Sequence, residues 1–349
     1  MNYIGSKATL LPFIQGTIQN FVQDKIEDFT DLFAGAGCVG FHFKKSGVRV
    51  IANDLQYYSY SLCKHLIGNN IKPNFSNISS EIPRKSTLFT DTHNDLVSYL
   101  EQLEGLKGFI FRNYAPSGSE NERMYFSDEN AMQCDAIRMK IEQWRISGSI
   151  DEGEYYWLLA SLIESIDRYA NTASVYGAYL KSLKKSAKQK MRLSLLPVVG
   201  NSHKNIIFNE DANSLIKNIE GQILYLDPPY NHRQYATNYH LLETIARYDN
   251  PIIYGKTGLR RYEDQKSGYC QKALAKDCLE DLIMNAHYDY IFLSYNNEGL
   301  IPIEFIQSTM KRRGKYQMFE IDYARYKADN NREYKDTRTT EYLHCVKVR

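Results

Sequence analysis

The spacing of apolar and polar residues predicts alternating helices and strands in the first part of the chain. Residues 10–22 have the apolar stripe of an amphipathic helix, and residues 29–33 form a short apolar run before a glycine-rich turn. Residues 48–52 are a β-branched run typical of a buried parallel strand, and a helix is expected at about residues 56–67. This order predicts a doubly wound α/β sheet.

A long stretch then breaks the alternation. Residues 71–204 mix polar loops with helical stretches at 135–145 and 154–169. The expected elements after it are strands at 205–209, 222–226, 290–294, 316–321 and 341–348, and helices at about 238–248 and 271–286. We therefore expect a split catalytic domain, with residues 1–70 as its first part, a mostly helical insertion at 71–204, and 205–349 as its second part.

Composition narrows the class of protein without indicating an activity. The chain has 349 residues, of which 43% are apolar and 24% charged, as in ordinary globular proteins. It has no apolar stretch long enough to cross a membrane. The six cysteines are scattered without a Cys-x-x-Cys pair, which argues against zinc or a disulfide framework and fits a reducing cytoplasm. We expect a cytoplasmic protein with no membrane partner and no metal.

The net charge of +2 means that any affinity for nucleic acid must come from a local patch. Residues 181–192 carry six basic side chains and no acidic one. Such a segment alone favours a solvated helix face over a nucleic-acid contact. If it is helical, four of its lysines share one face: Lys181, Lys184, Lys185 and Lys188.

A glycine-rich motif follows the first expected strand. Residues 35–40 are Gly-Ala-Gly-Cys-Val-Gly and fit the Gly-x-Gly-x-x-Gly pattern, with Asp54 after the next strand. Glycines let a backbone turn sharply and approach a ligand, and a carboxylate accepts hydrogen bonds from ribose hydroxyls. The motif indicates a nucleotide-like cofactor. It fits a nicotinamide enzyme, an S-adenosylmethionine enzyme or a plain strand-to-helix turn.

A second motif, Asp227-Pro228-Pro229-Tyr230, follows an apolar strand, where α/β sheets bind their ligands. It suits methyl transfer to the amine of adenine, a poor nucleophile because its lone pair is delocalised into the ring. The Asp227 carboxylate and the Pro228 carbonyl would accept the two amine hydrogens, and the two prolines restrict the backbone. Tyr230 would stack on a base that has left the duplex. We predict that all four residues are catalytic.

Several motifs, in this order, resemble those of the α-group, Dam-type adenine DNA methyltransferases. They are Asn-Tyr-Ile-Gly-Ser-Lys at 2–7, Asp-Leu-Phe-Ala-Gly-Ala-Gly at 31–37, Asn-Asp at 53–54 and the tetrapeptide at 227–230. The strings 231–235 and 238–244 are similar to restriction–modification methylases of the NlaIII and FokI kind. The resemblance implies S-adenosylmethionine as cofactor, double-stranded DNA as substrate, target recognition by the insertion, and a cognate restriction endonuclease that acts separately.

The resemblance also implies roles for individual residues. Tyr3 and Lys7 match the opening motif that contacts the cofactor, although the Dam members of the family have tryptophan where this chain has Tyr3. Asp54 corresponds to the ribose contact, and Asp227 to a contact with both cofactor and target. Asp211 resembles the acid that binds the adenine of the cofactor, although an acid after a strand is as often a helix cap. The residues that would line the methionine side are Phe33, Gly35 and Gly37.

The predicted contacts with DNA rest on the residues alone. The lysines of residues 181–192 would face phosphates, while Arg168, Asn171 and Thr172 would supply hydrogen bonds to bases. Arg233 would contact phosphate or the extruded base. Its neighbour His232, and His240, fit such a contact as well as a structural role.

Three rival functions remain at this point. Another amine methyltransferase, acting on cytosine, RNA or a protein glutamine, shares the tetrapeptide chemistry, but the motif order and the large insertion disfavour it. A nicotinamide oxidoreductase explains the glycine turn but gives residues 227–230 no role. A DNA-binding module with an inactive cofactor site is disfavoured because every expected catalytic position is filled.

Overall fold

The computed structural model describes residues 5–83, 92–324 and 338–349, and these residues form two compact units. Unit 1 comprises residues 64–199 and 237–261, and unit 2 comprises 2–63, 200–236 and 262–349, apart from the residues outside the described ranges. The predicted insertion, 71–204, differs from unit 1 mainly at residues 237–261, which belong to unit 1 although they follow the tetrapeptide in sequence. The assignment of target recognition to this unit stays a prediction.

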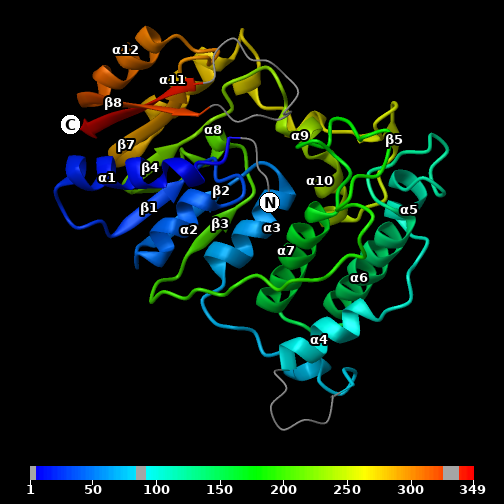
Figure 1. The fold of residues 1–349 in the computed structure, drawn as a ribbon. Helices are drawn as coiled ribbons and strands as arrows, with labels where there is room; N and C mark the ends of the chain where they lie inside the picture. The colour runs from blue at the N-terminus through cyan, green and yellow to red at the C-terminus, as the bar shows by residue number, and fades with distance from the viewer. Residues whose placement is uncertain (1–4, 84–91, 325–337) are drawn as a thin grey trace. The chain divides into compact units, whose positions relative to one another are not determined.

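Unit 2 is built on a seven-stranded sheet in the order β3-β2-β1-β4-β7-β9-β8 (Figure 1). The first five strands in this order are parallel, and β9 runs antiparallel to both of its neighbours. The strands are β1 (Asp28–Asp31), β2 (Arg49–Asn53), β3 (Ile206–Phe208), β4 (Glu220–Leu226), β7 (His287–Asn296), β8 (Gly314–Ala324) and β9 (Arg338–Val348).

Helices cover both faces of this sheet, and the alternation of side chains along β7 shows how. Ile291 and Leu293 belong to one apolar cluster with helices α8, α11 and α12. Tyr290 and Phe292 point to the other face, where both meet the ring of Phe21 on α1 edge-on, at centroid distances of 6.2 and 5.7 Å. The helices of unit 2 are α1 (Leu11–Val22), α2 (Cys38–Lys45), α3 (Tyr57–Cys63), α8 (Ala212–Leu215), α11 (Ala275–Asn285) and α12 (Ile303–Arg313). The short helix α9 (Tyr235–Asn238) lies where the chain passes from unit 2 to unit 1. The predicted doubly wound α/β fold is confirmed.

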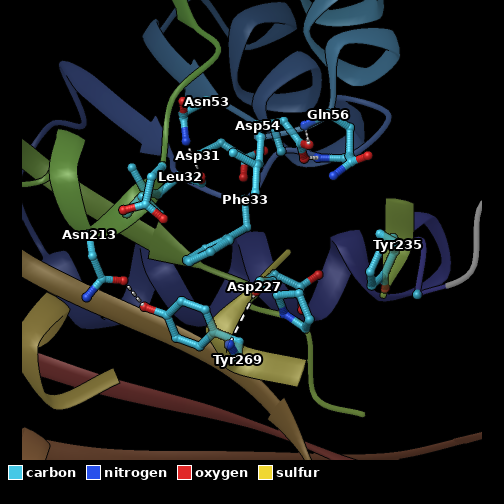
Figure 2. A pocket seen from close by; sticks show the side chains of 18 of the residues that line it. Asp31, Leu32, Phe33, Asn53, Asp54, Gln56, Asn213, Asp227, Tyr235 and Tyr269 are labelled. Atoms are coloured by element: carbon cyan, nitrogen blue, oxygen red, sulfur yellow. Dashed lines mark hydrogen bonds between the residues drawn. The ribbon is translucent and has the colours of Figure 1, made fainter. Parts of the chain in front are cut away.

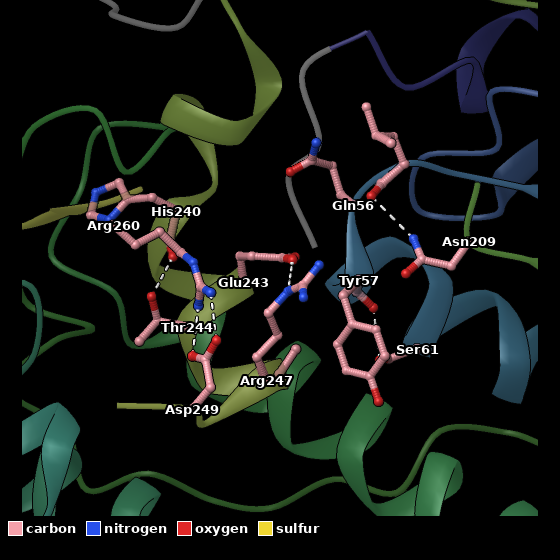
Figure 3. Close-up of polar contacts among 12 residues, drawn as sticks. Gln56, Tyr57, Ser61, Asn209, His240, Glu243, Thr244, Arg247, Asp249 and Arg260 are labelled. Atoms are coloured by element: carbon pink, nitrogen blue, oxygen red, sulfur yellow. Dashed lines mark hydrogen bonds and ion pairs between the residues drawn. The ribbon is translucent and has the colours of Figure 1, made fainter. Parts of the chain in front are cut away.

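Unit 1 is mostly helical, and buried polar side chains join its segments. The Arg138 guanidinium on α6 is 1% exposed and donates to the carbonyl oxygens of Ile245 and Ala246 near the end of α10. Beyond α10, Arg260 forms a bidentate ion pair with Asp249 (Figure 3). The elements are α4 (Thr92–Glu101), α5 (Phe109–Tyr114), α6 (Asp128–Ile146), α7 (Glu152–Arg168), α10 (His240–Arg247), β5 (Ile253–Tyr254) and β6 (Leu259–Arg260).

The spacing of apolar and polar residues predicted the long helices and strands better than the short ones. The helices expected at 135–145 and 154–169 correspond to α6 and α7, which begin earlier because Ser127 and Asp151 cap their first turns. The helix expected at 56–67 is α3 followed by a π-helical turn at Lys64–Gly68. Among the described residues, no helix is both long enough and apolar enough to span a lipid bilayer.

Candidate active site

A cavity of about 420 Å³ lies in unit 2, where β1, β2 and β4 end. Its lining includes the residues that follow each of these strands, as expected for an open α/β sheet. Six of the predicted cofactor-binding residues line it: Lys7, Phe33, Gly35, Asp54, Asp211 and Asp227. Gly37 is outside the lining, and Tyr3 lies outside the described residues.

The glycine turn after β1 has the backbone conformation that the motif predicted. Gly35 and Gly37 have φ angles of 53° and 77°, in the left-handed region that favours glycine. The Gly35 amide donates to Asp54 Oδ2 at 2.8 Å, and the Gln56 amide donates to Asp54 Oδ1 at 2.8 Å (Figure 2). Asp54 therefore holds the turn by accepting from both backbone amides.

Asn53, the last residue of β2, joins the segments that follow β1 and β3 and is 1% exposed. Its amide group donates to the carbonyl oxygens of Leu32 and Glu210 and accepts from the Glu210 amide. Asp211 caps α8 by accepting from the Ser214 amide, and it also lines the cavity. The helix cap considered for Asp211 is therefore present, and its contact with the adenine of the cofactor stays a prediction.

The tetrapeptide begins where β4 ends, and a lysine holds its carboxylate. Lys7 Nζ lies 3.0 Å from Asp227 Oδ1 and 2.8 Å from Oε1 of Glu341 on β9. Pro229 lines the cavity with Asp227, whereas Pro228 and Tyr230 are outside its lining. The Tyr230 carbonyl accepts from the Leu300 amide at 3.0 Å, which fixes the segment beyond the prolines.

Burial and neighbouring charges shift the acid–base properties of this site. Burial raises the pKa of Asp227 to about 6, against the opposing effect of Lys7. Burial also raises the pKa of Asp31 to about 7, opposed by the Gly40 amide and reinforced by the charges of Asp227 and Asp54. Burial would lower the pKa of Lys7, but the carboxylates of Asp227 and Glu341 together raise it well above its usual value. Lys7 is therefore a permanent cation at the cavity.

An aromatic wall closes one side of the cavity, and the sequence motifs did not indicate it. The rings of Phe33 and Tyr269 meet edge-to-face at a centroid distance of 5.2 Å. The Tyr269 hydroxyl donates to Asn213 Oδ1 at 2.8 Å, so the ring is fixed from behind (Figure 2). Tyr269 belongs to no motif that we recognised, and its position could not be inferred from the sequence around it.

The basic segment in unit 1 is not the helix that its lysine spacing suggested. Residues 181–192 form a turn and irregular coil, so the four lysines do not share a helical face. Lys184 Nζ donates to the Thr172 carbonyl at 2.9 Å, and the Lys184 amide donates to Asn171 Oδ1 at 2.9 Å. Lys181, Lys185 and Lys188 are exposed, whereas Lys184 is partly buried.

The predicted base-reading groups have different surroundings. Asn171 is fully buried, and its amide group donates to the carbonyl oxygens of Met124 and Leu180, so its polar atoms are already engaged. Thr172 is also buried, while Arg168, at the end of α7, is exposed. Asn171 therefore supports the backbone of unit 1 in this structure.

The candidates that follow the tetrapeptide also differ in exposure. His232 and Arg233 are exposed, in keeping with the predicted contact to phosphate or base. His240 is fully buried, with Nε2 2.9 Å from the Tyr176 carbonyl, and burial lowers its pKa to about 4. His240 thus has the structural role that was its alternative. In the described part of the chain, no group of three potential ligands could hold a metal ion.

Sequence comparison agrees with this geometry over most of the chain. A family model for the D12 class N6 adenine-specific DNA methyltransferases matches residues 3–309. The type II methyltransferase M.NlaIII of Neisseria lactamica is 47% identical, over 99% of this chain and 99% of that protein. M.CviAII of Paramecium bursaria Chlorella virus 1 is 34% identical, over 100% of this chain and 98% of that protein.

One further relative is a longer protein. The type II methyltransferase M.FokI of Planomicrobium okeanokoites is 43% identical over 95% of this chain, which spans only 50% of M.FokI. The family match covers the glycine turn, the tetrapeptide and the whole of unit 1. The chain therefore belongs to the D12 class of N6 adenine-specific DNA methyltransferases.

Proposed function

We propose that this adenine methyltransferase takes its methyl group from S-adenosylmethionine and acts on a base extruded from duplex DNA, with Asp227 at the reacting centre. The observation that carries the choice of cofactor is the charge of the cavity. Seven acidic residues line it, and among the described residues Lys7 is its one lysine or arginine. The acidic residues are Asp31, Asp54, Glu210, Asp211, Asp227, Asp277 and Asp281.

This charge pattern separates two of the cofactors considered. A dinucleotide carries an anionic pyrophosphate, which carboxylates repel and which needs amides or cations around it. S-adenosylmethionine carries a sulfonium and an ammonium cation, which acidic walls attract. The Phe33 and Tyr269 rings suit the flat, apolar face of its adenine, and Asp54 and Asp211 suit hydrogen bonds to ribose and base. When bound, the sulfonium supplies an electrophilic methyl group.

The residues of the chain supply position and hydrogen-bond acceptors. Asp227 Oδ1 faces Lys7, and among the described residues no contact occupies its second oxygen. That oxygen and the Pro228 carbonyl would accept the two hydrogens of the target amine, which leaves its lone pair directed at the methyl group. Stacking on Tyr230 would hold the base outside the helix, because the amine cannot reach Asp227 while the base is stacked in the duplex.

Incubation with methyl-labelled S-adenosylmethionine and duplex DNA, followed by digestion to nucleosides, tests this function directly. We expect label on the exocyclic amine of adenine, and calorimetry should detect S-adenosylmethionine binding without DNA but no NAD binding. Gly35→Val should abolish cofactor binding, because a β-branched residue is strained at its φ of 53° and Gly35 lines the cavity. Label on cytosine, RNA or protein would contradict the proposal.

We further propose that the enzyme protects host DNA against a separate restriction endonuclease. The relatives named above are type II methyltransferases, and a relative 38% identical over 95% of this chain is named modification methylase StsI. Plasmid DNA from cells that express the chain should carry methylated adenine at one short sequence and resist an endonuclease that cuts there. Methylation without a fixed sequence would argue against this role.

A further inference from the structure

Three charged side chains lie in a row from the cavity into the sheet of unit 2. Asp227 is at the cavity, Lys7 is next and Glu341 is furthest inside, with side-chain exposures of 18%, 5% and 1%. Lys7 Nζ lies between the two carboxylates, 3.0 Å from one and 2.8 Å from the other. Neither motif analysis nor the family resemblance gave Glu341 a role.

The Glu341 carboxylate is fixed by the two strands that flank β9. Ser294 of β7 donates to Oε1, and the Tyr323 hydroxyl of β8 donates to Oε2 at 3.4 Å. The register places Glu341 beside Asn296 on one side and Ile321 on the other, within the hydrogen-bonded sheet. The carboxylate therefore has a position set by three strands, which makes it a rigid anchor.

Lys7 needs such an anchor. It precedes the first helical turn, Ala8–Leu10, and has no place in the sheet. A lysine side chain loses rotamer entropy when it is fixed, and a buried ammonium is strongly disfavoured without paired charges. Glu341 supplies the second charge and a fixed oxygen, so the ammonium stays against Asp227 Oδ1 and the other Asp227 oxygen is left for the cavity.

We propose that Glu341 is a positioning residue for methyl transfer: it fixes Lys7, and through Lys7 it sets the orientation and the charge of Asp227. This inference rests on the proposed role of Asp227 as the acceptor of the target amine's hydrogens. Glu341 touches neither substrate nor cofactor in this scheme. Its effect passes entirely through the Lys7 ammonium.

The charges around Asp227 determine in which direction its pKa should shift in each variant. Asp227 faces Lys7 from the N-terminal segment, Glu341 from β9 and Asp31 from β1, with the tyrosines of β4 and the tetrapeptide, Tyr225 and Tyr230, nearby. After burial, Lys7 lowers the pKa of Asp227, and Glu341 raises it. Because Glu341 acts through Lys7, E341Q should release the ammonium and move the pKa of Asp227 above about 6, in the same direction as K7M. The direct charge of Glu341 acting alone would instead give a shift below that value in E341Q.

The test measures single-turnover methyl transfer in wild type, E341Q, K7M and the double variant, at saturating S-adenosylmethionine and duplex DNA. We expect E341Q to be slower than wild type by about tenfold, and the double variant to be no slower than K7M alone. If the double variant is slower than wild type by the product of the two single effects, Glu341 does not act through Lys7, and the proposal is overturned. E320Q makes the same change of charge at an exposed position of β8 and should leave the rate unchanged.

A second measurement needs no turnover, so it separates this proposal from the proposed function. The Asp227 carboxyl is titrated by carbon NMR in the labelled full chain, with D227N to assign its signal and thermal unfolding to verify the fold. We expect the titration to move upward in both E341Q and K7M. An unchanged or lowered titration in folded E341Q overturns the role of Glu341, whereas raised titrations without methyl transfer by wild type would overturn only the proposed function.

Discussion

The buried polar side chains of the two units have different partners. In unit 1, the buried Asn171, Arg138 and Asp135 are directed at backbone groups: Asn171 and Arg138 donate to carbonyl oxygens, and Asp135 accepts from the Ile110 and Phe111 amides at the start of α5. Such pairs replace hydrogen bonds that irregular chain would otherwise make with water. They stabilise the fold.

At the cavity of unit 2, buried acids face one another instead. Asp31 and Asp227 interact unfavourably, and burial raises the pKa of each. Arrangements of this kind reduce stability and are common where a ligand or a reaction needs them. The role of a buried polar residue can therefore be inferred from its partner: a backbone partner indicates support of the fold, and a like charge at a cavity indicates chemistry.

Asp227→Ala should have the largest effect on activity. It removes an acceptor for the target amine, so we expect methyl transfer to fall by about a thousandfold, while S-adenosylmethionine still binds. Single-turnover kinetics and calorimetry on the full chain measure the two quantities. Tyr230→Phe keeps the stacking ring and should cost far less activity than Tyr230→Ala. A folded Asp227→Ala protein with normal activity would remove Asp227 from the reaction.

Asn171→Ala should show the opposite pattern. It leaves buried backbone groups of Met124, Leu180 and Lys184 without their partner, and we expect a loss of about 3 kcal/mol in the free energy of unfolding. Denaturant unfolding measures this loss, and the rate of methyl transfer per folded molecule should change little. If the variant is stable but methylates a different set of sites, Asn171 reads bases after all.

Asp31→Asn should change how stability depends on pH. The folded chain holds the Asp31 proton up to about pH 7, whereas the carboxyl of an unfolded chain has a pKa near 3.8. This group therefore contributes stability that is fully present below about pH 4 and is lost as the pH rises through 7. In Asp31→Asn, which keeps an acceptor for the Gly40 amide, the free energy of unfolding should fall less between pH 5 and pH 8.

The exposed Asp264→Asn serves as the matched control for this titration and should retain the wild-type pH dependence. An Asp31→Asn variant whose unfolding free energy falls as steeply as that of wild type would show that another group accounts for the loss.

Lys185→Ala with Lys188→Ala should have the smallest effect, and only on DNA affinity. Both side chains are exposed, so stability should not change. If they face phosphates, the slope of log affinity against log salt concentration should decrease in magnitude by about two. The same sites should be methylated. Lys184→Ala is the contrasting variant, because its ammonium is bound to the Thr172 carbonyl and its loss should affect stability instead. Unchanged salt dependence in the double variant would exclude this segment from the phosphate contacts.

These residues also show what could be predicted from the sequence. The glycine turn, Asp54 and the tetrapeptide could be predicted because each candidate residue directly follows its strand in the chain. The helical face considered for residues 181–192 is absent because Asn171 and the Thr172 carbonyl hold Lys184 in a coil, which spacing alone cannot reveal. Tyr269 and Glu341 were missed for the same reason: their partners are distant in sequence. Glu341 and Lys7 are 334 residues apart.

That separation has a consequence for biosynthesis. A ribosome makes the chain from its N-terminus, and β9 lies between β7 and β8 in the sheet, so the sheet stays open along β7 and β8 until residues 338–348 have emerged. Until then Lys7 has no Glu341, and β7 and β8 expose unpaired edges. Folding of unit 2 must therefore finish late and across long loops, which is slow and leaves a nascent chain open to aggregation. Because Lys7 and Glu341 meet only then, we expect methyl transfer to begin only after this delay.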